Sequence, residues 1–339
     1  MVKWNTAMKF SFIIAAYNVE KYITQCINSI VNSLKNRHDY EILVINDGSK
    51  DNTYFIVENL LEENKALKLF DQKNSGVSIT RNTGIHLAKG EYVFFIDGDD
   101  YLADLPSDDF YNFIDSCNGS DAVVFPANSV KNGKISLFFE TKYTKINDAS
   151  MEVLAKFLED DYSFGWCAWH YVFRRNFLIE NKILFPEGRI SEEVQFTLQM
   201  FLKANNISVY NKFPVYTYRM DNVSSLTRKP NYKFVDDIAY MIKTNLPIVN
   251  SLSDEKIKNL IRLNYQTLII VILSLYHLYN KTQKKEIIRK LKELVEIYNI
   301  DKEYQHYYRP RERIVNAMLK MLGYHCVGWM WGIKKKLWR

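Results

Sequence analysis

The chain has 339 residues, of which 47% are hydrophobic and 25% are charged, so it can bury a large core and is not disordered as a whole. Its net charge of +6 comes from residues 309–339, which hold eight Lys or Arg and one Glu. The remainder is nearly neutral, which excludes a broad nucleic-acid-binding surface. The four cysteines are far apart in the sequence, which disfavours a zinc site or a disulfide framework.

The first hundred residues alternate between apolar runs and stretches with helical spacing. Strands are predicted over 10–16, 41–45, 67–70 and 92–96, and helices over 20–34, 51–63 and 76–88. This alternation predicts a doubly wound, mostly parallel α/β sheet. Further along the chain, 123–125 and 213–218 are predicted strands and 191–203 a predicted helix.

After Pro230 the pattern is helical for the rest of the chain. Helices are predicted over 231–249, 253–279, 283–298 and 310–322. We therefore expect an α/β domain over 1–230, a helical domain over 231–308 and a basic aromatic tail over 309–339. The sequence shows neither a signal peptide nor an apolar run long enough for a membrane span, so we expect a cytoplasmic protein.

Polar clusters follow three of the predicted strands. They are Tyr17-Asn18, Asp47-Gly48-Ser49 and Asp97-Gly98-Asp99-Asp100. In a parallel sheet these strand ends lie at one edge, where α/β proteins bind ligands. Three neighbouring acids repel one another unless a cation lies among them, and oxygen ligands suit Mg²⁺ or Mn²⁺. A turn or a helix N-cap is the alternative for such an Asp-Gly cluster.

Four motifs carry a resemblance to a known family. They are Ser11 to Asn18, Glu41 to Thr53, Asn74 to Gly84 and Gly90 to Asp100. In this order they resemble the family 2 inverting glycosyltransferases of GT-A fold, densely over 10–103 and more thinly up to Thr227. The resemblance implies sugar transfer from a nucleotide-diphosphate donor, UDP-linked, to a hydroxyl of a glycan or lipid-linked acceptor. A hexosyl or N-acetylhexosaminyl transferase of surface polysaccharide or capsule synthesis is the expected type.

The resemblance also implies roles for the strand-end residues. The nucleotide-binding residues would be Ala15, Tyr17, Asn18, Asp47, Asn74, Arg81 and Asp97. Asp47 would accept a hydrogen bond from the uracil ring, and Asp97 would hold the ribose. Asp99 would ligate Mn²⁺ or Mg²⁺, and Asp100 would act as a catalytic residue that positions the donor sugar. Arg81 has an alternative interpretation as an ion-pair partner of the acidic cluster.

An inverting transfer needs a general base to deprotonate the acceptor hydroxyl. The resemblance places this base at Glu193, which follows Glu192 and stands where the family has Asp. Glutamate is one methylene longer than aspartate, so its carboxylate must be positioned differently. The alternative is helix capping, with Ser191 as the N-cap and the two acids in the first turn. The two interpretations are compatible.

Two further pairs of residues are candidates for weaker roles. Arg219 and Ser225 lie in a segment that resembles one closing over the diphosphate, and both side chains suit phosphate oxygens. A surface loop is the alternative. Trp169 and His170 stand where acceptor-side residues are expected in the family. Buried aromatic packing is the alternative for them.

The tail alternates Trp, Met, Leu and Ile with clustered Lys, between Met318 and Arg339. Trp beside Lys is typical of a helix that lies on an anionic membrane surface. We therefore expect peripheral attachment to the inner face of the cell membrane, where a lipid-linked acceptor would be presented. A final helix packed on the body is the alternative.

Two other functions are compatible with a similar sheet. A nucleotidyltransferase or dehydrogenase is disfavoured, because Ala15-Ala16-Tyr17-Asn18 follows the first strand in place of a Gly-x-Gly-x-x-Gly motif. A catalytically inactive sugar-nucleotide or glycan-binding protein stays open, since Glu193 replaces the family aspartate.

Overall fold

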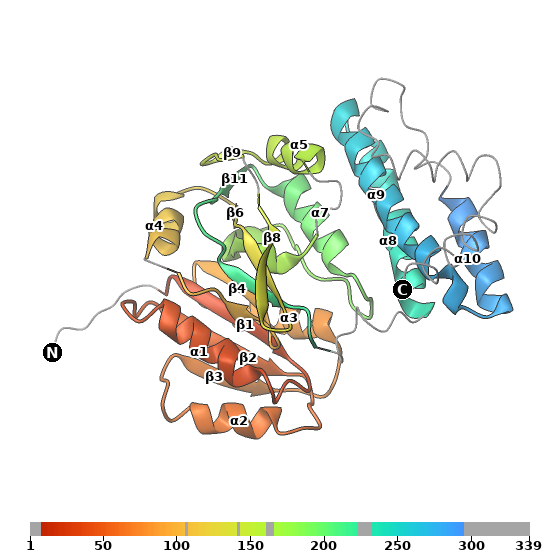
Figure 1. Cartoon of the computed structure of the whole chain (residues 1–339). Coiled ribbons are helices and arrows are strands. Elements are labelled where there is room, and N and C mark those ends of the chain that lie inside the picture. Colours follow the sequence, from red (N-terminus) through yellow and green to blue (C-terminus); the bar gives the residue numbers. More distant parts are fainter. Residues whose placement is uncertain (1–7, 106–107, 141–142, 161–165, 223–231, 295–339) are drawn as a thin grey trace. The chain divides into compact units, whose positions relative to one another are not determined.

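The computed structural model describes residues 8–105, 108–140, 143–160, 166–222 and 232–294. The chain forms two compact units (Figure 1). The first contains residues 1–150 and 166–223, and the second contains residues 151–165 and 224–339. The predicted tail 309–339 and the predicted helix 310–322 lie outside the described residues.

An eight-stranded sheet forms the centre of the first unit, with strand order β3-β2-β1-β4-β10-β6-β11-β9 (Figure 1). Its strands are β1 (Phe10–Ala16), β2 (Tyr40–Asn46), β3 (Leu67–Asp71), β4 (Tyr92–Asp97), β6 (Ala122–Val124), β9 (Asp148–Ala149), β10 (Tyr171–Arg174) and β11 (Asn206–Val209). The first four in this order are parallel, whereas β10 runs antiparallel to both β4 and β6. Strands β1 and β4 are buried almost throughout, as expected for a sheet covered on both faces.

Alternate residues of the central strands pack against different helices. Phe12 and Ile14 of β1 belong to a core with Ile27 and Ile30 of α1 (Ile23–Ser33). Ile13 points the other way and touches Gly84 of α3 (Val77–Leu87), where any Cβ would clash with its side chain. The other helices of this unit are α2 (Thr53–Leu60), α4 (Asp109–Ser116), α6 (Arg175–Glu180), α7 (Glu193–Lys203) and a 3₁₀ turn at Ala168–His170.

A second sheet in the same unit has the order β5-β12-β7-β8. Its strands are β5 (Tyr101–Leu102), β12 (Tyr216–Arg219), β7 (Ala127–Lys131) and β8 (Lys134–Phe139). Asp97 ends β4 of the large sheet, and Tyr101 begins β5 of the small one. The segment 97–100 therefore links the two sheets, and β12 lies beside it because β12 pairs with β5.

The second unit is helical. It contains α5 (Ser150–Asp160), α8 (Tyr232–Asn250), α9 (Glu255–Leu275) and α10 (Lys281–Glu293). Lys256 of α9 pairs with Glu159 of α5 at 2.5 Å, and Asn280 and Gln283 form a capping box that begins α10. No helix within the described ranges is long and apolar enough to span a bilayer.

The sequence prediction of an α/β, doubly wound and mostly parallel sheet followed by helices is confirmed. Its seven elements over residues 10–97 all form, with bounds shifted by three residues or fewer. The short strands of the small sheet were not predicted, except β12. They are too brief for their hydrophobic pattern to stand out, and they exist because tertiary pairing orders them.

Candidate active site

The acidic segment Asp97–Asp100 lies against the end of β1. The Gly98 N–H donates to the Ala15 carbonyl at 3.2 Å. A Cβ at Gly98 would lie 3.1 Å from that carbonyl oxygen and 3.1 Å from Val19 Cγ2, so a larger side chain would push the segment outward. Glycine is therefore needed here for close packing, and this packing fixes where the three carboxylates lie.

Asp100 is held from inside the protein by β12. Its carboxylate accepts one hydrogen bond from the Tyr216 hydroxyl (2.7 Å) and another from the Arg219 N–H (2.7 Å), and the residue is 1% exposed. Burial, followed by the charges of Asp99 and Asp97, raises the pKa of Asp100 well above its ordinary value. In this structure Asp100 anchors the acidic segment to the small sheet.

The Arg219 side chain makes contacts that the sequence did not predict. Its Nε donates to the Asp99 carbonyl at 2.8 Å, and its Nη2 donates to Gln25 Oε1 at 2.6 Å. The guanidinium lies 4.8 Å from the ring centre of Tyr22 and 5.3 Å from that of Tyr101. Arg219 thus connects the acidic segment to α1, while Ser225, its predicted partner at the diphosphate, lies outside the described residues.

Asp99 is the carboxylate of the segment that sequence analysis assigned to a metal. Its Oδ2 accepts a hydrogen bond from Asn222 Nδ2 at 2.7 Å. Burial, and then the charge of Asp97, raises the pKa of Asp99. The protein around Asp99 therefore stabilises its negative charge poorly. A bound cation would stabilise that charge.

Arg81 joins the acidic segment to the glutamate pair. From α3 it forms ion pairs with Asp97 (2.7 Å), Glu192 (2.8 Å) and Glu193 (3.3 Å), and it is 4% exposed. Burial opposes its charge, but the carboxylates outweigh burial and raise the pKa of Arg81. These contacts match the alternative interpretation of Arg81 as a partner of the acids. They also gather three carboxylates around one guanidinium.

Glu193 is the first residue of α7. Its Oε1 accepts a hydrogen bond from the Ala168 N–H at 3.0 Å, and 21% of its side-chain surface is exposed. Burial raises the pKa of Glu193 to about 7, against the opposing charge of Arg81. Such a carboxyl group exchanges its proton near neutral pH, as a general base requires.

The backbone before Glu193 shows why simple capping does not describe it. Ser191 adopts a left-handed conformation with φ of 64°, and the cap position of α7 is occupied by Glu192. The Glu192 side chain makes no capping hydrogen bond, and the Val194 N–H donates to the Ser191 carbonyl at 3.3 Å. The Ser191 N-cap considered from the sequence is therefore absent, and both glutamates turn toward Arg81.

Asp47 organises the loop at the end of β2 and the start of α3. Its carboxylate accepts hydrogen bonds from the Ser75 N–H (2.8 Å), the Gly76 N–H (2.9 Å) and Gln72 Nε2 (2.8 Å). Asn74 Nδ2 donates to the Asp47 carbonyl at 3.0 Å. Two predicted nucleotide-binding residues, Asp47 and Asn74, are thus brought together by direct contact.

Tyr17 and Asn18 directly follow β1 at the same edge of the sheet. Asn18, with φ of 54°, accepts from the Lys50 N–H at 2.8 Å and donates its own N–H to Ser49 Oγ at 3.0 Å. Tyr17 is 44% exposed, so its ring is accessible to a ligand. The loops after β1 and β2 therefore support each other around an exposed aromatic ring.

Trp169 and His170 belong to an aromatic cluster behind Asp100. Trp169 stacks on His170 (ring centres 4.1 Å apart) and on Tyr216 (4.5 Å), and it is 4% exposed. His170 is 1% exposed, and burial lowers its pKa to about 3. His170 is therefore neutral near pH 7, and Trp169 supports the tyrosine that holds Asp100.

Sequence reasoning missed the residues that hold the acidic segment from behind. Tyr216 donates to Asp100 and accepts from the Asp97 N–H, and Asn222 donates to Asp99. The only available signal was the alternating pattern of 213–218, which predicts a strand but gives no partner. The assignment of these residues required the pairing of β12 with β5.

The carboxylate oxygens of the acidic segment suit a hard divalent cation, provided that a diphosphate supplies further ligands. In the part of the chain that the structure describes, no three His, Cys, Asp or Glu side chains form a ready-made cation site. Mg²⁺ in phosphate-handling sites commonly uses one or two carboxylates and completes its shell with substrate oxygens and water. Asp99, with its raised pKa, is the residue that suits this arrangement.

A model of the family "Glycosyl transferase family 2" matches residues 11–138. The chain carries a family 2 glycosyltransferase domain. The matched stretch includes the acidic segment, Asp47 and Arg81, and it ends before the glutamate pair.

Similar proteins extend beyond the matched stretch. The uncharacterized glycosyltransferase EpsJ of Bacillus subtilis is 30% identical over 67% of this chain and 65% of EpsJ. The poly(ribitol-phosphate) β-N-acetylglucosaminyltransferase TarS of Staphylococcus aureus is 33% identical over 60% of this chain and 34% of TarS. The chain therefore spans less than two thirds of either relative.

Solved structures share the fold of this chain. Residues 1–349 of S. aureus TarS, in complex with UDP-GlcNAc, superpose with a TM-score of 0.71 at 23% identity, over 95% of this chain and 90% of that one. The mannosyltransferase PcManGT of Pyrobaculum calidifontis, in complex with GDP-Man and Mn²⁺, gives a TM-score of 0.54 at 15% identity over 97% and 88% of the two chains. The fold is that of a GT-A glycosyltransferase.

Proposed function

We propose that this protein is a metal-dependent inverting glycosyltransferase that uses a UDP-sugar. One observation carries the proposal: Arg81 brings Asp97, at the end of β4, and Glu193, at the start of α7, to the same guanidinium. A nucleotide-side carboxylate and a carboxyl group with a pKa of about 7 thus pair with different nitrogens of one guanidinium. Transfer of a sugar to a hydroxyl needs both functions in one site.

The nucleotide would bind across the ends of β1, β2 and β4. The exposed Tyr17 ring is available to the base, and Asp97 is available to the ribose. A Mn²⁺ or Mg²⁺ ion held by Asp99 would stabilise the negative charge that develops on the leaving diphosphate. UDP is the preferred nucleotide because TarS, which shares the fold, binds UDP-GlcNAc.

Glu193 would remove the proton of the acceptor hydroxyl. Its carboxylate is oriented by the Ala168 N–H and by Arg81, which restricts its rotation. In this chain α7 begins at Glu193 itself, two residues after the left-handed Ser191. Asp100 would act through the acidic segment, by holding Asp97 and Asp99 in place.

We further infer that the acceptor is a glycan or lipid-linked saccharide of a surface polymer. Support comes from TarS, a poly(ribitol-phosphate) β-N-acetylglucosaminyltransferase that is similar over 60% of this chain. The Lys- and Trp-rich sequence of 309–339 supports attachment to an anionic membrane surface, at which such an acceptor would be presented. Liposome sedimentation of the full chain and of a chain ending at residue 308 tests this attachment.

The central test is donor turnover. The full-length protein is incubated with UDP-, GDP- and dTDP-sugars in the presence of Mn²⁺, Mg²⁺ or chelator, and nucleotide release is measured. We expect release of UDP only, and only with metal. Asp99→Asn should lose metal-dependent donor binding, whereas Asp109→Asn, a surface acid paired with Lys212, should keep it.

The outcomes separate the proposal from its alternative. Tight binding of a UDP-sugar without turnover, even with acceptor present, would indicate a catalytically inactive sugar-nucleotide-binding protein. Release of UDP that is unaffected by chelator would contradict the metal assignment of Asp99.

A further inference from the structure

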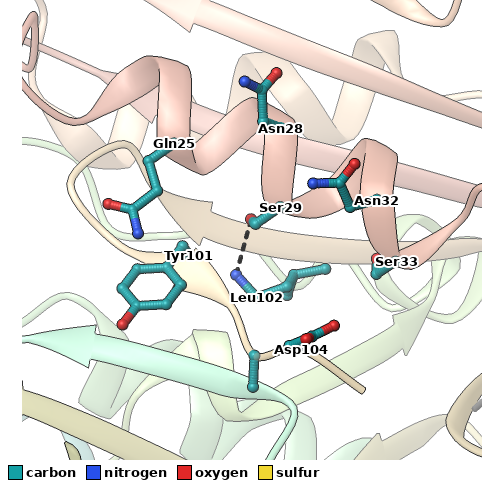
Figure 2. Close-up of a pocket in the computed structure, with 9 residues that line it drawn as sticks. Gln25, Asn28, Ser29, Asn32, Ser33, Tyr101, Leu102 and Asp104 are labelled. Carbon is teal, nitrogen blue, oxygen red and sulfur yellow. Dashed lines mark hydrogen bonds between the residues drawn. The ribbon is translucent and has the colours of Figure 1, made fainter. Parts of the chain in front are cut away.

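A cavity lined mainly by residues with polar side chains lies beside α1, next to the acidic segment. Its volume is about 410 Å³, and it lies between α1 and the segment 101–104. Figure 2 shows Gln25, Ser29 and Ser33 along the helix, facing the Tyr101–Asp104 segment, with Ser29 accepting a hydrogen bond from the Leu102 N–H at 3.0 Å. This volume falls within the range of roughly 300–1,000 Å³ that is typical of small-ligand sites.

The composition of α1 is unusual for a helix with a solvent-facing side. Its eleven residues, ITQCINSIVNS, include no charged residue. Asn28, Ser29, Asn32 and Ser33 recur at helical spacing on the polar side, although Lys, Glu or Gln would favour the helix more. The opposite side of α1, with Ile23, Ile27 and Ile30, is buried in the core and accounts for the packing of this helix on the sheet. Ser29 accepts from the Leu102 N–H and Ser33 shares a hydrogen bond with the buried Tyr111 hydroxyl, so these hydroxyls support the fold. The exposed amides of Asn28 and Asn32 are not explained by that packing.

The chemistry of the lining favours a neutral ligand rich in hydroxyl groups. Gln25, Asn28 and Asn32 are exposed and line the cavity. The amides of Asn28 and Asn32 each offer an acceptor oxygen and two donor hydrogens, whereas the Gln25 oxygen already accepts from Arg219 and its NH₂ group can donate. Asp104 is the single charged residue among the described residues of the lining. None of the described lining residues offers a cation to an anionic phosphate, and an acyl chain would have to displace water from amides without replacing their hydrogen bonds.

One wall of the cavity is continuous with the acidic segment. Gln25 Oε1 accepts from Arg219 Nη2, and the Tyr101 ring faces the Arg219 guanidinium. Arg219 in turn donates to the Asp99 carbonyl at 2.8 Å. A ligand in the cavity therefore contacts side chains that touch the segment expected to bind the metal.

We propose that this cavity is a saccharide-binding subsite for an uncharged portion of the acceptor glycan, held by the amides of Gln25, Asn28 and Asn32. The inference rests on the proposed function for the identity of the ligand as acceptor. The saccharide recognition itself rests on the cavity and its lining.

Binding to the full-length protein in the absence of donor tests the subsite directly. The probes are the neutral trisaccharides chitotriose, cellotriose and maltotriose, with ribitol 5-phosphate as a charged comparison, followed by isothermal titration and by amide chemical shifts. We expect at least one trisaccharide to bind, with shifts at α1 and residues 101–104. Asn28→Ala combined with Asn32→Ala should weaken this binding by about tenfold or more, because two amide partners are removed.

Thr24→Ala is the matched control, since Thr24 is exposed on the same helix but does not line the cavity. It should leave binding unchanged, and circular dichroism should show that all variants fold, since alanine favours the helix. The inference is overturned if no trisaccharide binds, if the double variant binds as well as wild type, or if ribitol 5-phosphate binds equally well. Wild-type donor turnover is measured in parallel: its absence, with trisaccharide binding intact, would overturn the proposed function and leave the subsite standing.

Discussion

The acidic segment and the glutamate pair both consist of carboxylates, yet the groups that stabilise the negative charges differ between the two regions. Asp99 and Asp100 receive hydrogen bonds from neutral groups, namely the Asn222 amide, the Tyr216 hydroxyl and a backbone N–H. Glu192 and Glu193 share the Arg81 guanidinium. Among the described residues Asp99 and Asp100 thus have no direct ion-pair partner, which suits a cation. Glu192 and Glu193 are partly neutralised by Arg81, which suits proton transfer.

The largest expected effect is on the second region. Glu193→Gln should lower the rate of transfer by about 10²- to 10⁴-fold, because a general base is lost. Donor binding should be unchanged, since the amide keeps the size of the side chain. Single-turnover transfer and donor titration measure the two effects, with the exposed Glu187→Gln as control. Transfer by Glu193→Gln at the wild-type rate would place the base elsewhere.

The next largest effect is expected from replacing Arg81, the cation that the glutamate pair shares. Arg81→Met should lower the free energy of unfolding by about 3–5 kcal/mol, because buried carboxylates lose their shared partner. The loss should shrink toward pH 5, where Glu193, with its pKa of about 7, is protonated. Urea denaturation at pH 8 and pH 5 measures both.

Arg37→Met provides the comparison for Arg81. Arg37 pairs with Asp39 and Asp115, which are 20% and 37% exposed in their side chains. Its loss should cost about 1 kcal/mol or less, as for a surface ion pair. Equal costs for the two variants would contradict the view that Arg81 holds a buried cluster.

A smaller effect on stability is expected from removing the Tyr216 hydroxyl, which holds the acidic segment from inside the protein. Tyr216→Phe should lower the free energy of unfolding by about 1–3 kcal/mol, because buried Asp100 loses a hydrogen-bond donor. Tyr210→Phe is the control, since the buried Tyr210 hydroxyl has no hydrogen-bond partner among the described residues. If both substitutions cost the same, the hydroxyl of Tyr216 does not anchor Asp100.

The pH dependence of activity and of stability tests the role of Glu193 without any substitution. Glu193 must be deprotonated to act as a base, so kcat/KM should rise with pH and level off above about 7. Its pKa in the folded protein lies above the ordinary 4.5, so its contribution to stability is present below about 4.5 and is lost as pH rises to about 7. Transfer rates and melting temperatures between pH 5 and 9 test both signs. A rate that is flat across pH 7 would exclude Glu193 as the titrating group.

The placement of the proposed nucleotide-binding residues at one edge of the sheet was predictable because these residues follow strands in sequence. Tyr17, Asp47 and Asp97 each come directly after an apolar run, and the topology of a parallel sheet places such residues at one edge. The partners of Asp99 and Asp100 were not predictable, because Tyr216 and Asn222 are more than a hundred residues away. Arg219 illustrates the same limit: its residue type suggested phosphate, but its position between Tyr22 and Tyr101 is set by strand pairing.

The sequence by itself determined the α/β architecture, the order of the central elements and the clustering of carboxylates at one strand end. These features follow from local hydrophobic periodicity and from the fixed geometry of parallel strands. Only the tertiary structure decided that Arg81 joins Asp97 to Glu193, and that Asp100 points inward to β12. Burial and long-range pairing set those contacts, and they raise the pKa of Glu193 to about 7. No local pattern in the chain encodes either effect.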